Sequence, residues 1–376
     1  MSDADSARTA RQHVCSMAPL GVWLRVIADN GGVPPRYWGK LAGVLAVSAL
    51  AAPLRVAERL CYGPSRMARV SIDEPPLYIQ GAGRSGTTHL LNLLARDPEF
   101  GVVSTFQAIA APMFLVGRGR LERMIAGSVP ATRPMDDMAV ALEEPQEEEV
   151  ALANTSHLSW VHHLSFPRRA KAYLEKYATM RLTAEELKRW ERAYLDVLRK
   201  ATLASGGRRL LLKSPTNLGR TGELLRLFPD AKFIHIVRNP YVVYASMMHL
   251  YRRMLPICQL DDVAPEEVAA TVLDAYAAMM RQFMGDRASI PTGHLAEVRF
   301  EDLERQPMAE LERLYAELTL PGWDRAQKPI AEYLRTLSGY RRNVHRIDAQ
   351  IIDIVDRHWG FAVEAWGYRP PNGTSG

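Results

Sequence analysis

The chain has 376 residues, of which 47% are hydrophobic and 24% charged, a composition that is ordinary for a globular enzyme with an ample core. Residues 1–70 hold nine Lys and Arg against four Asp and Glu, which accounts for the whole net charge of +5 and argues against a broad nucleic-acid surface on the remainder. Three distant cysteines, Cys15, Cys61 and Cys258, argue against a disulfide framework or a zinc site and favour a reducing, cytoplasmic compartment.

Residues 1–75 are predicted to form a helical extension that contains an uncharged apolar segment, Leu41 to Leu54. Its fourteen residues are fewer than the roughly 18 that cross a bilayer, and we expect no membrane span in the chain. Tyr37 and Trp38 precede the segment, and four basic residues flank it: Arg36, Lys40, Arg55 and Arg59. Residues 36–59 are therefore expected either to lie at a membrane surface or to pack on the following domain.

A glycine-rich loop follows a short apolar strand at 77–80 and leads into a Leu-rich helix at 86–96. The loop reads GAGRSGTT from Gly81 to Thr88. Strand, glycine loop and helix N-terminus together are typical of a phosphate-binding site, because the glycines let the backbone approach the anion and the helix dipole favours negative charge.

The residues in and after this loop discriminate between classes of nucleotide-binding protein. A dinucleotide site requires an acidic residue about 20 positions on, at the end of the next strand, whereas Asp97 and Glu99 precede that strand. An ATPase loop requires Lys where Thr87 stands. The cation lies inside the loop instead, at Arg84.

Strands and helices alternate along the rest of the chain, which predicts an α/β fold with a parallel sheet and helices on both faces. Further strands are expected at 101–105, 209–213, 232–237 and 295–300. Further helices are expected at 183–204, 217–228, 240–253 and 264–284. Arg84, Lys213 and Arg238 each fall at or just past the carboxyl end of a strand, where such sheets bind ligands. Residues 110–182 lack the alternation and are predicted to cover the substrate, and residues 371–376 are predicted to be a disordered tail.

The run from Arg84 to Thr88 closely resembles the 5′-phosphosulfate loop of sulfotransferases that use 3′-phosphoadenosine-5′-phosphosulfate (PAPS). Arg238 at a strand end and Ser246 eight residues later resemble the 3′-phosphate site of that family. Lys213-Ser214-Pro215 and the segment LAEVRFEDLERQP at 295–307 are similar to further elements of its bacterial branch. The resemblance covers about residues 76–370 and implies a P-loop-like sulfotransferase fold.

By this resemblance, the protein transfers a sulfuryl group from PAPS to an acceptor hydroxyl without a metal. Arg84 and Lys213 would stabilise the charge that develops on the leaving group. His89 would stack on adenine or simply cap its helix. The residues implied to bind the co-substrate are Gly83, Arg84, Ser85, Gly86, Thr87, Thr88, His89, Arg238, Ser246 and, on a closing loop, Arg341 and Arg342. The alternatives are a P-loop kinase and a non-catalytic nucleotide-binding protein.

The general base is the least defined part of the site. Many relatives carry Glu or His about 20 to 25 residues beyond the loop cation, but here that neighbourhood offers Gln107, which cannot take a proton. The acidic run EEPQEEE at 143–149 resembles another family element, and Glu147 is the first choice, with His157 second. Alternatively these acids only stabilise a helix start. The acceptor is hypothesised to be amphiphilic, because the covering region would lie next to the apolar extension.

Overall fold

The computed structural model describes residues 13–126, 141–337 and 346–371. In this part of the chain, five parallel strands form a sheet in the order β2-β3-β1-β4-β5. They are β1 (Leu77–Gln80), β2 (Phe100–Val102), β3 (Arg209–Lys213), β4 (Lys232–Val237) and β5 (Leu295–Arg299). The predicted parallel α/β fold is confirmed, and the carboxyl ends of β1, β3 and β4 lie side by side at the edge where such sheets bind ligands.

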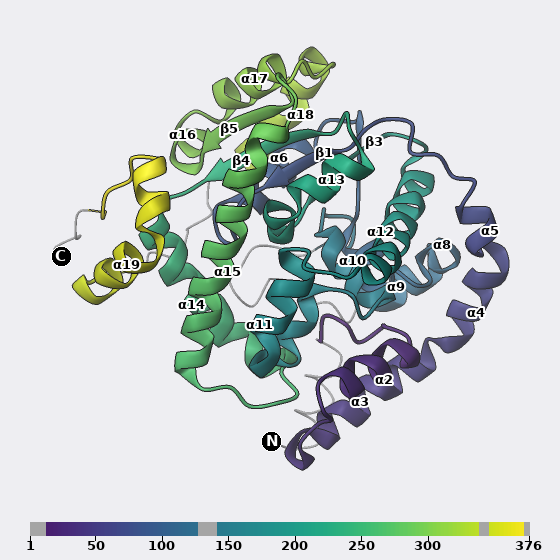
Figure 1. Cartoon of the computed structure of the whole chain (residues 1–376). Coiled ribbons are helices and arrows are strands. Elements are labelled where there is room, and N and C mark those ends of the chain that lie inside the picture. The colour runs from purple at the N-terminus through teal and green to yellow at the C-terminus, as the bar shows by residue number, and fades with distance from the viewer. Residues whose placement is uncertain (1–12, 127–140, 338–345, 372–376) are drawn as a thin grey trace.

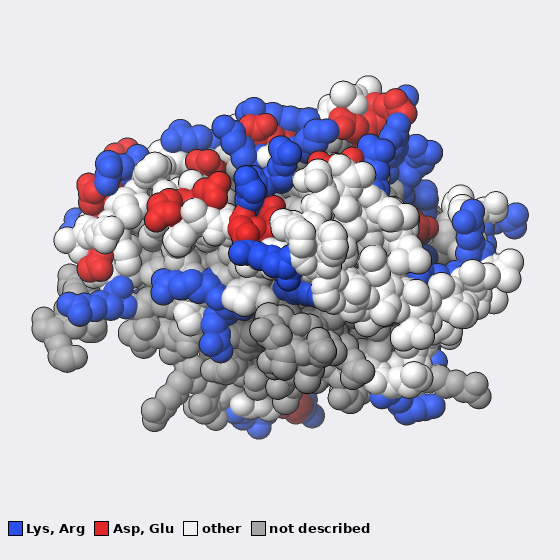
Figure 2. Space-filling model, turned by 90° about the horizontal axis from the view of Figure 1, so that it is seen from below, with Lys and Arg blue, Asp and Glu red and all other residues white. Residues whose placement is uncertain are grey.

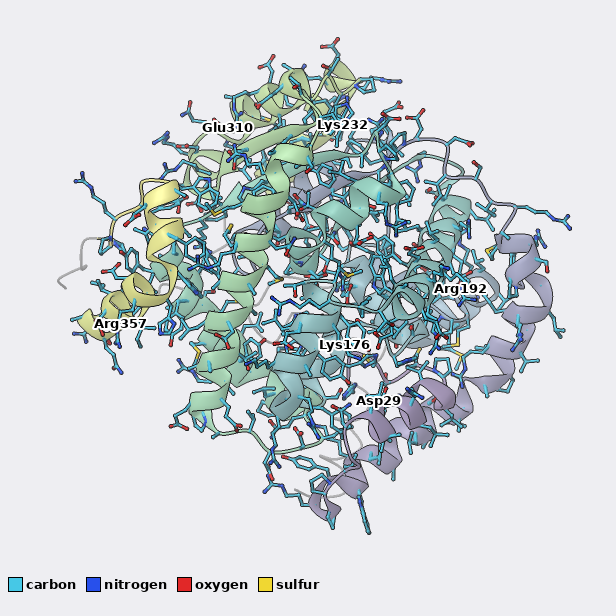
Figure 3. The ribbon with its side chains drawn as sticks, in the orientation of Figure 1. Asp29, Lys176, Arg192, Lys232, Glu310 and Arg357 are labelled. Atoms are coloured by element: carbon cyan, nitrogen blue, oxygen red, sulfur yellow. The ribbon has the colours of Figure 1, made fainter. Side chains whose placement is uncertain are left out.

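Helices cover both faces of the sheet (Figure 1). Side chains of β1 alternate between two apolar clusters, with Leu77 and Ile79 in one and Tyr78 in the other. The first cluster includes α6 (Thr87–Leu94), α16 (Phe300–Arg305), α17 (Pro307–Glu317) and α18 (Trp323–Thr336). The second includes α12 (Ala184–Ser205), α13 (Thr221–Leu227), α14 (Pro240–Cys258), α15 (Pro265–Asp286), which continues into η6 (Arg287–Ser289), and α19 (Ala349–Ala365). Charged side chains such as Arg192 and Arg357 are exposed around these layers (Figure 3).

The strands and helices differ from the predicted ones mainly where one element runs into the next. Three predicted strands match to the residue: 77–80, 209–213 and 232–237. Two are shorter than predicted because a helix begins at their end: Ser104 caps α7 (Thr105–Ile109), and Phe300 opens α16. The predicted helix 217–228 is divided into η5 (Pro215–Gly219) and α13.

The region predicted to cover the substrate, 110–182, is largely helical where the structure describes it, except at residues such as 141–147. The segment that begins at residue 141 runs next to residues 103–106, just after β2. It then forms short helices at the carboxyl edge of the sheet. The helices are α8 (Phe114–Gly117), α9 (Arg120–Ala126), α10 (Glu148–Thr155), η2 (Trp160–Leu164), η3 (Pro167–Arg169), α11 (Ala170–Tyr173) and the π-helical η4 (Leu174–Ala178).

The N-terminal extension consists of helices that run along one side of the molecule (Figure 1). They are α2 (Leu20–Asp29), η1 (Pro35–Tyr37), α3 (Trp38–Leu50), α4 (Ala52–Cys61) and α5 (Pro64–Met67). Together η1, α3 and α4 make a helical stretch of 27 residues, Pro35–Cys61, which by length and composition is sufficient to cross a membrane. This stretch is longer than the fourteen-residue apolar run at 41–54, because the helix continues through the residues on both sides of that run. Residues 372–376 of the predicted tail lie outside the described residues.

Candidate active site

The glycine loop between β1 and α6 is held in a shape that only glycine permits at two positions. A Cβ on Gly81 would lie 2.6 Å from the Ile236 carbonyl oxygen. Gly86, at φ +95°, caps α6, and a Cβ there would lie 2.2 Å from the Phe300 ring. Arg84 between them also has a left-handed backbone, with φ of 68°. The loop is therefore fixed against β4 and α16 before any ligand binds.

The structure brings Arg238 and Ser246, the two residues of the predicted 3′-phosphate site, next to Arg84 of the glycine loop. Arg84 Nε donates to Ser246 Oγ at 3.0 Å, and Arg238 NH1 donates to the Arg84 carbonyl at 3.0 Å. The Arg238 guanidinium also lies 4.3 Å from the centre of the Phe300 ring. Asn239 caps α14 by accepting from the Tyr241 N–H at 3.1 Å, which sets the angle at which Ser246 faces the loop.

Lys213 connects the glycine loop to the acidic run. It ends β3, opposite Ile79 of β1, and its side chain is only 3% exposed. Its Nζ donates to Thr88 Oγ1 at 3.2 Å and to Glu147 Oε1 at 2.6 Å. The pairing places the candidate cation Lys213 next to the candidate base Glu147.

The three consecutive acids at the start of α10 have separate environments. Glu147 is the N-cap residue, yet its side chain makes no cap hydrogen bond and reaches Lys213 instead. Glu148 is buried and accepts from the Lys213 N–H at 3.0 Å and from Asn217 Nδ2 at 2.6 Å; desolvation raises its pKa to about 7. Glu149 is buried against Arg220. Neither Glu148 nor Glu149 lies on a solvated face, so the interpretation of this run as exposed helix-stabilising acids is wrong for both.

Backbone pairing explains how Glu147 reaches the sheet. The Thr105 N–H donates to the Glu144 carbonyl at 2.8 Å, and the Gln146 N–H donates to the Val103 carbonyl at 2.8 Å. This short antiparallel contact carries the chain past the end of β2 to Lys213. Gln107 has a structural role: its side chain accepts from the Ser104 N–H at 3.4 Å and completes the capping box of α7.

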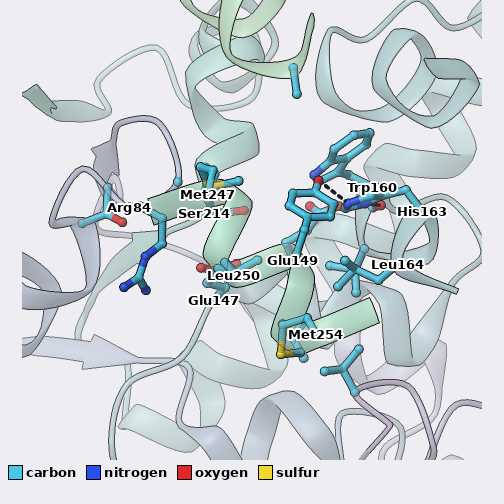
Figure 4. A pocket seen from close by; sticks show the side chains of 18 of the residues that line it. Arg84, Glu147, Glu149, Trp160, His163, Leu164, Ser214, Met247, Leu250 and Met254 are labelled. Atoms are coloured by element: carbon cyan, nitrogen blue, oxygen red, sulfur yellow. Dashed lines mark hydrogen bonds between the residues drawn. The ribbon is translucent and has the colours of Figure 1, made fainter. Parts of the chain in front are cut away.

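A cavity of about 350 Å³ extends from these groups toward the N-terminal segment. Arg84, Thr88 and Glu147 line its polar end (Figure 4). Most of its remaining wall is apolar, including Leu164, Met247, Leu250, Met254, Ile257 and Val14. The arrangement is suited to an apolar molecule that presents one polar group to Glu147 and Lys213.

Not every predicted site residue reaches this cavity. His157, the second candidate for the base, is not among the lining residues; it lies within the electrostatic reach of Asp29 and Arg25 of α2, and burial lowers its pKa. His89 makes an edge contact with the Phe300 ring at 6.4 Å. Arg341 and Arg342 lie outside the described residues. Among the described residues, no group of three His, Cys, Asp or Glu side chains is placed to hold a metal.

The cavity also contains a histidine that the sequence analysis did not select. His163 stacks on Trp160 with ring centres 3.7 Å apart. Its Nδ1 lies 2.6 Å from the Trp160 carbonyl and must carry the proton, so Nε2 accepts from the Tyr251 hydroxyl at 2.8 Å (Figure 4). Burial lowers the pKa of His163 to about 4, so the ring is neutral near pH 7. No spacing in the sequence distinguishes it from its neighbour His162.

Comparison with known proteins decides the family. The profile described as "Sulfotransferase family" matches residues 75–325, about two thirds of the chain. The chain belongs to the sulfotransferase family. This sulfotransferase is 29% identical over 358 residues to omega-hydroxy-beta-dihydromenaquinone-9 sulfotransferase Stf3 of Mycobacterium bovis, across 93% of this chain and 92% of the relative. The Stf3 of Mycobacterium tuberculosis strain CDC 1551 matches equally.

Two crystal structures confirm the sulfotransferase fold. Sulfotransferase STF9 from Mycobacterium avium superimposes with a TM-score of 0.69 at 17% identity, covering 90% of this chain and 87% of that one. Sulfotransferase STF1 from Mycobacterium tuberculosis H37Rv superimposes with a TM-score of 0.64 at 20% identity, covering 96% and 93%. The predicted activity is therefore confirmed as far as sulfuryl transfer, and the kinase and non-catalytic alternatives are set aside.

Proposed function

We propose that this sulfotransferase takes its sulfuryl group from PAPS and transfers it to the hydroxyl of an amphiphilic acceptor held in the cavity. The observation that carries the proposal is the cavity itself, which joins the loop cation Arg84 and the carboxylate of Glu147 to a long apolar wall. Membership of the sulfotransferase family implies PAPS as the co-substrate.

The residues around the glycine loop fit a bisphosphorylated nucleotide. Arg84, Arg238 and Ser246 form a connected polar group at one side of the loop, and we assign Arg238 and Ser246 to the 3′-phosphate. Lys213 and Thr88 lie at the other side, 3.2 Å apart, and we assign Lys213 to the 5′-phosphosulfate. Two cations in a partly buried site supply charge-assisted hydrogen bonds of the kind that bind phosphate.

Glu147 and Lys213 divide the chemistry of the transfer. The acceptor oxygen forms a bond to sulfur while the bond from sulfur to the 5′-phosphate oxygen breaks, and the electron pair of that bond stays with the phosphate. Glu147 takes the proton of the acceptor hydroxyl, and Lys213 stabilises the charge that develops on the leaving oxygen. The 2.6 Å ion pair between the two residues must then open as the reaction begins. Arg84 is assigned to the same developing charge.

The amphiphilic acceptor is supported by the cavity wall and by a relative. Stf3 is named for an omega-hydroxylated dihydromenaquinone, a hydroxyl on an apolar body. The wall formed by Leu250, Met254, Ile257 and Val14 suits such a molecule, because burying apolar surface favours binding by about 25 cal/mol per Å².

The test is an acceptor screen with labelled PAPS and the full chain. A series of primary alcohols of increasing chain length, presented in detergent micelles, separates the contribution of the apolar part from that of the hydroxyl. We expect kcat/KM to rise with chain length until the cavity is filled. Activity confined to small polar alcohols would overturn the amphiphilic acceptor, and transfer from adenosine 5′-phosphosulfate as fast as from PAPS would overturn the co-substrate.

A further inference from the structure

Helix α3 buries two polar side chains beside Val44 on its inner side and carries no charged side chain on its outer side. Lys40 and Ser48 are buried on its inner side. Lys40 Nζ donates to the carbonyls of Pro256 and Gln259, each at 3.0 Å. Ser48 Oγ donates to the Ala18 carbonyl at 2.6 Å. A surface helix of a protein surrounded by water has the opposite pattern, with apolar residues inward and polar residues outward.

Helix α4 repeats this arrangement. Arg55 NH2 donates to the Ser48 carbonyl at 2.7 Å. The buried Glu58 pairs with Lys200 at 3.1 Å and accepts from the Val116 N–H at 2.9 Å. Of the charged side chains of α4, Arg55 is thus bound to α3, and Glu58 attaches the helix to the catalytic domain.

The outward side of α2, α3 and α4 carries large exposed apolar residues, which we call the apolar face. Its members and their exposed fractions are Leu20 (39%), Leu24 (64%), Trp38 (60%), Leu50 (81%), Val56 (59%) and Leu60 (82%). Seen from below, the side on which α2 and α3 lie, the molecule has a broad area without charged residues, beside which both basic and acidic side chains lie (Figure 2). A contiguous exposed patch of this kind marks an interaction site.

The charges next to the apolar face are mostly basic, although Asp29 ends α2 and pairs with Arg25, and Asp262 pairs with Arg36. Between residues 30 and 72 the only acidic residue is Glu58, which is buried. The exposed charges between α3 and residue 72 are those of Arg59, Arg66 and Arg69, and the exposed acids Asp73 and Glu74 follow them. Apolar side chains bordered by arginines complement an anionic lipid surface, where each nearby basic residue adds to the attraction.

We propose that the apolar face docks the enzyme on the surface of an anionic bilayer, with α2, α3 and α4 lying in the plane of the lipid headgroups. The same contacts exclude a membrane span. Lys40 near the start and Glu58 near the end tie the stretch Pro35–Cys61 to the catalytic domain, and Ser48 in the middle ties it to Ala18 of the preceding segment. A helix crossing the bilayer would have to break all of these contacts and bury their charges in hydrocarbon. Trp38 suits the interface, where tryptophan is enriched.

Vesicle binding by the full chain tests this proposal without reference to the acceptor or the nucleotide. The protein is sedimented with vesicles of phosphatidylcholine alone and of phosphatidylcholine mixed with phosphatidylglycerol. We expect the wild type to bind the mixed vesicles. In the double variant Leu50→Glu/Leu60→Glu, the affinity for these vesicles should fall roughly tenfold or more for each leucine that no longer enters the lipid. The matched control is Met284→Glu on α15, which removes a side chain that is 41% exposed outside the apolar face and should bind as wild type does.

Two further outcomes are decisive. Wild-type protein that stays in solution with both kinds of vesicle overturns the proposal. So does a wild type that forms dimers which Leu50→Glu/Leu60→Glu dissociates without any vesicle binding, since the face would then be an interface between two copies. Quenching by lipids brominated near the headgroup gives a readout that needs no charged variant: the emission lost on binding should be absent from Trp38→Phe.

Discussion

The substitution Glu147→Gln tests the assignment of the general base. Glutamine preserves the shape of the side chain, and its amide oxygen still accepts from Lys213 Nζ, which lies 2.6 Å from Glu147 Oε1 in the folded protein. What disappears is the capacity to take the acceptor's proton. Loss of a positioned general base lowers kcat by roughly 10²–10⁴, and we expect a decrease in this range.

The assay is initial-rate transfer from labelled PAPS to one good acceptor, with nucleotide affinity measured separately by titration of 3′,5′-adenosine bisphosphate. That affinity should stay near the wild-type value, because the loop contacts remain. Glu144→Gln is the matched control: it belongs to the same acidic run, but its carboxylate pairs with Arg96 at 2.5 Å and does not line the cavity. Near-normal kcat in Glu147→Gln, or an equal loss in Glu144→Gln, would refute the assignment.

Three other predictions concern the nucleotide site and the buried acid. Arg238→Ala should lower the affinity for 3′,5′-adenosine bisphosphate by about one to two decades, since a charge-assisted contact contributes roughly 1.5–3 kcal/mol. An equal loss of affinity for adenosine 5′-phosphate would contradict the 3′-phosphate assignment. Arg84→Ala and Lys213→Ala should each lower kcat more than they raise the KM for PAPS. Steady-state kinetics in which KM rises while kcat is unchanged would show that these residues bind the ground-state nucleotide and do not stabilise the transition state. The pKa of Glu148 is raised from about 4.5 to about 7, so the stability it contributes while protonated is lost as the pH rises between these values. Urea unfolding of wild type and Glu148→Gln across that window should show the difference in stability falling with pH, and a constant difference would exclude the linkage.

The parts of the fold that the sequence predicts well are those in which local pattern and burial agree. Strands β1, β3 and β4 lie inside the sheet, are covered on both faces and read as short apolar runs that end in turns. The sequence predicts the glycine loop equally well, because Gly81 and Gly86 satisfy steric requirements that no other residue meets. Because Arg84, Lys213 and Arg238 lie at or just past the ends of those three strands, the sequence also predicts that they lie close together.

Long-range contacts decide the features that the sequence left open. Glu147, Glu148 and Glu149 are consecutive and chemically alike, and only their different partners, Lys213, Asn217 and Arg220, give each a separate role. Nothing local marks these partners, since they come from β3 and the turn after it. The same holds for the cations of the extension: Lys40 was expected to flank an apolar segment that either meets a membrane or packs on the domain, and Lys40 itself is buried against α14.

The cavity and the apolar face are separated by one short piece of chain, and this relation links the two proposals. Val14 and Ile257 both line the cavity. His13, next to Val14, contacts the Cys258 carbonyl at 2.9 Å, and Pro256, next to Ile257, accepts from Lys40 of α3. An acceptor whose hydroxyl reaches Glu147 would therefore direct its apolar part toward the helices that dock on lipid. Under both proposals, the enzyme would sulfate a molecule whose apolar end never has to leave an apolar environment, so the large cost of exposing that end to water would not enter the reaction.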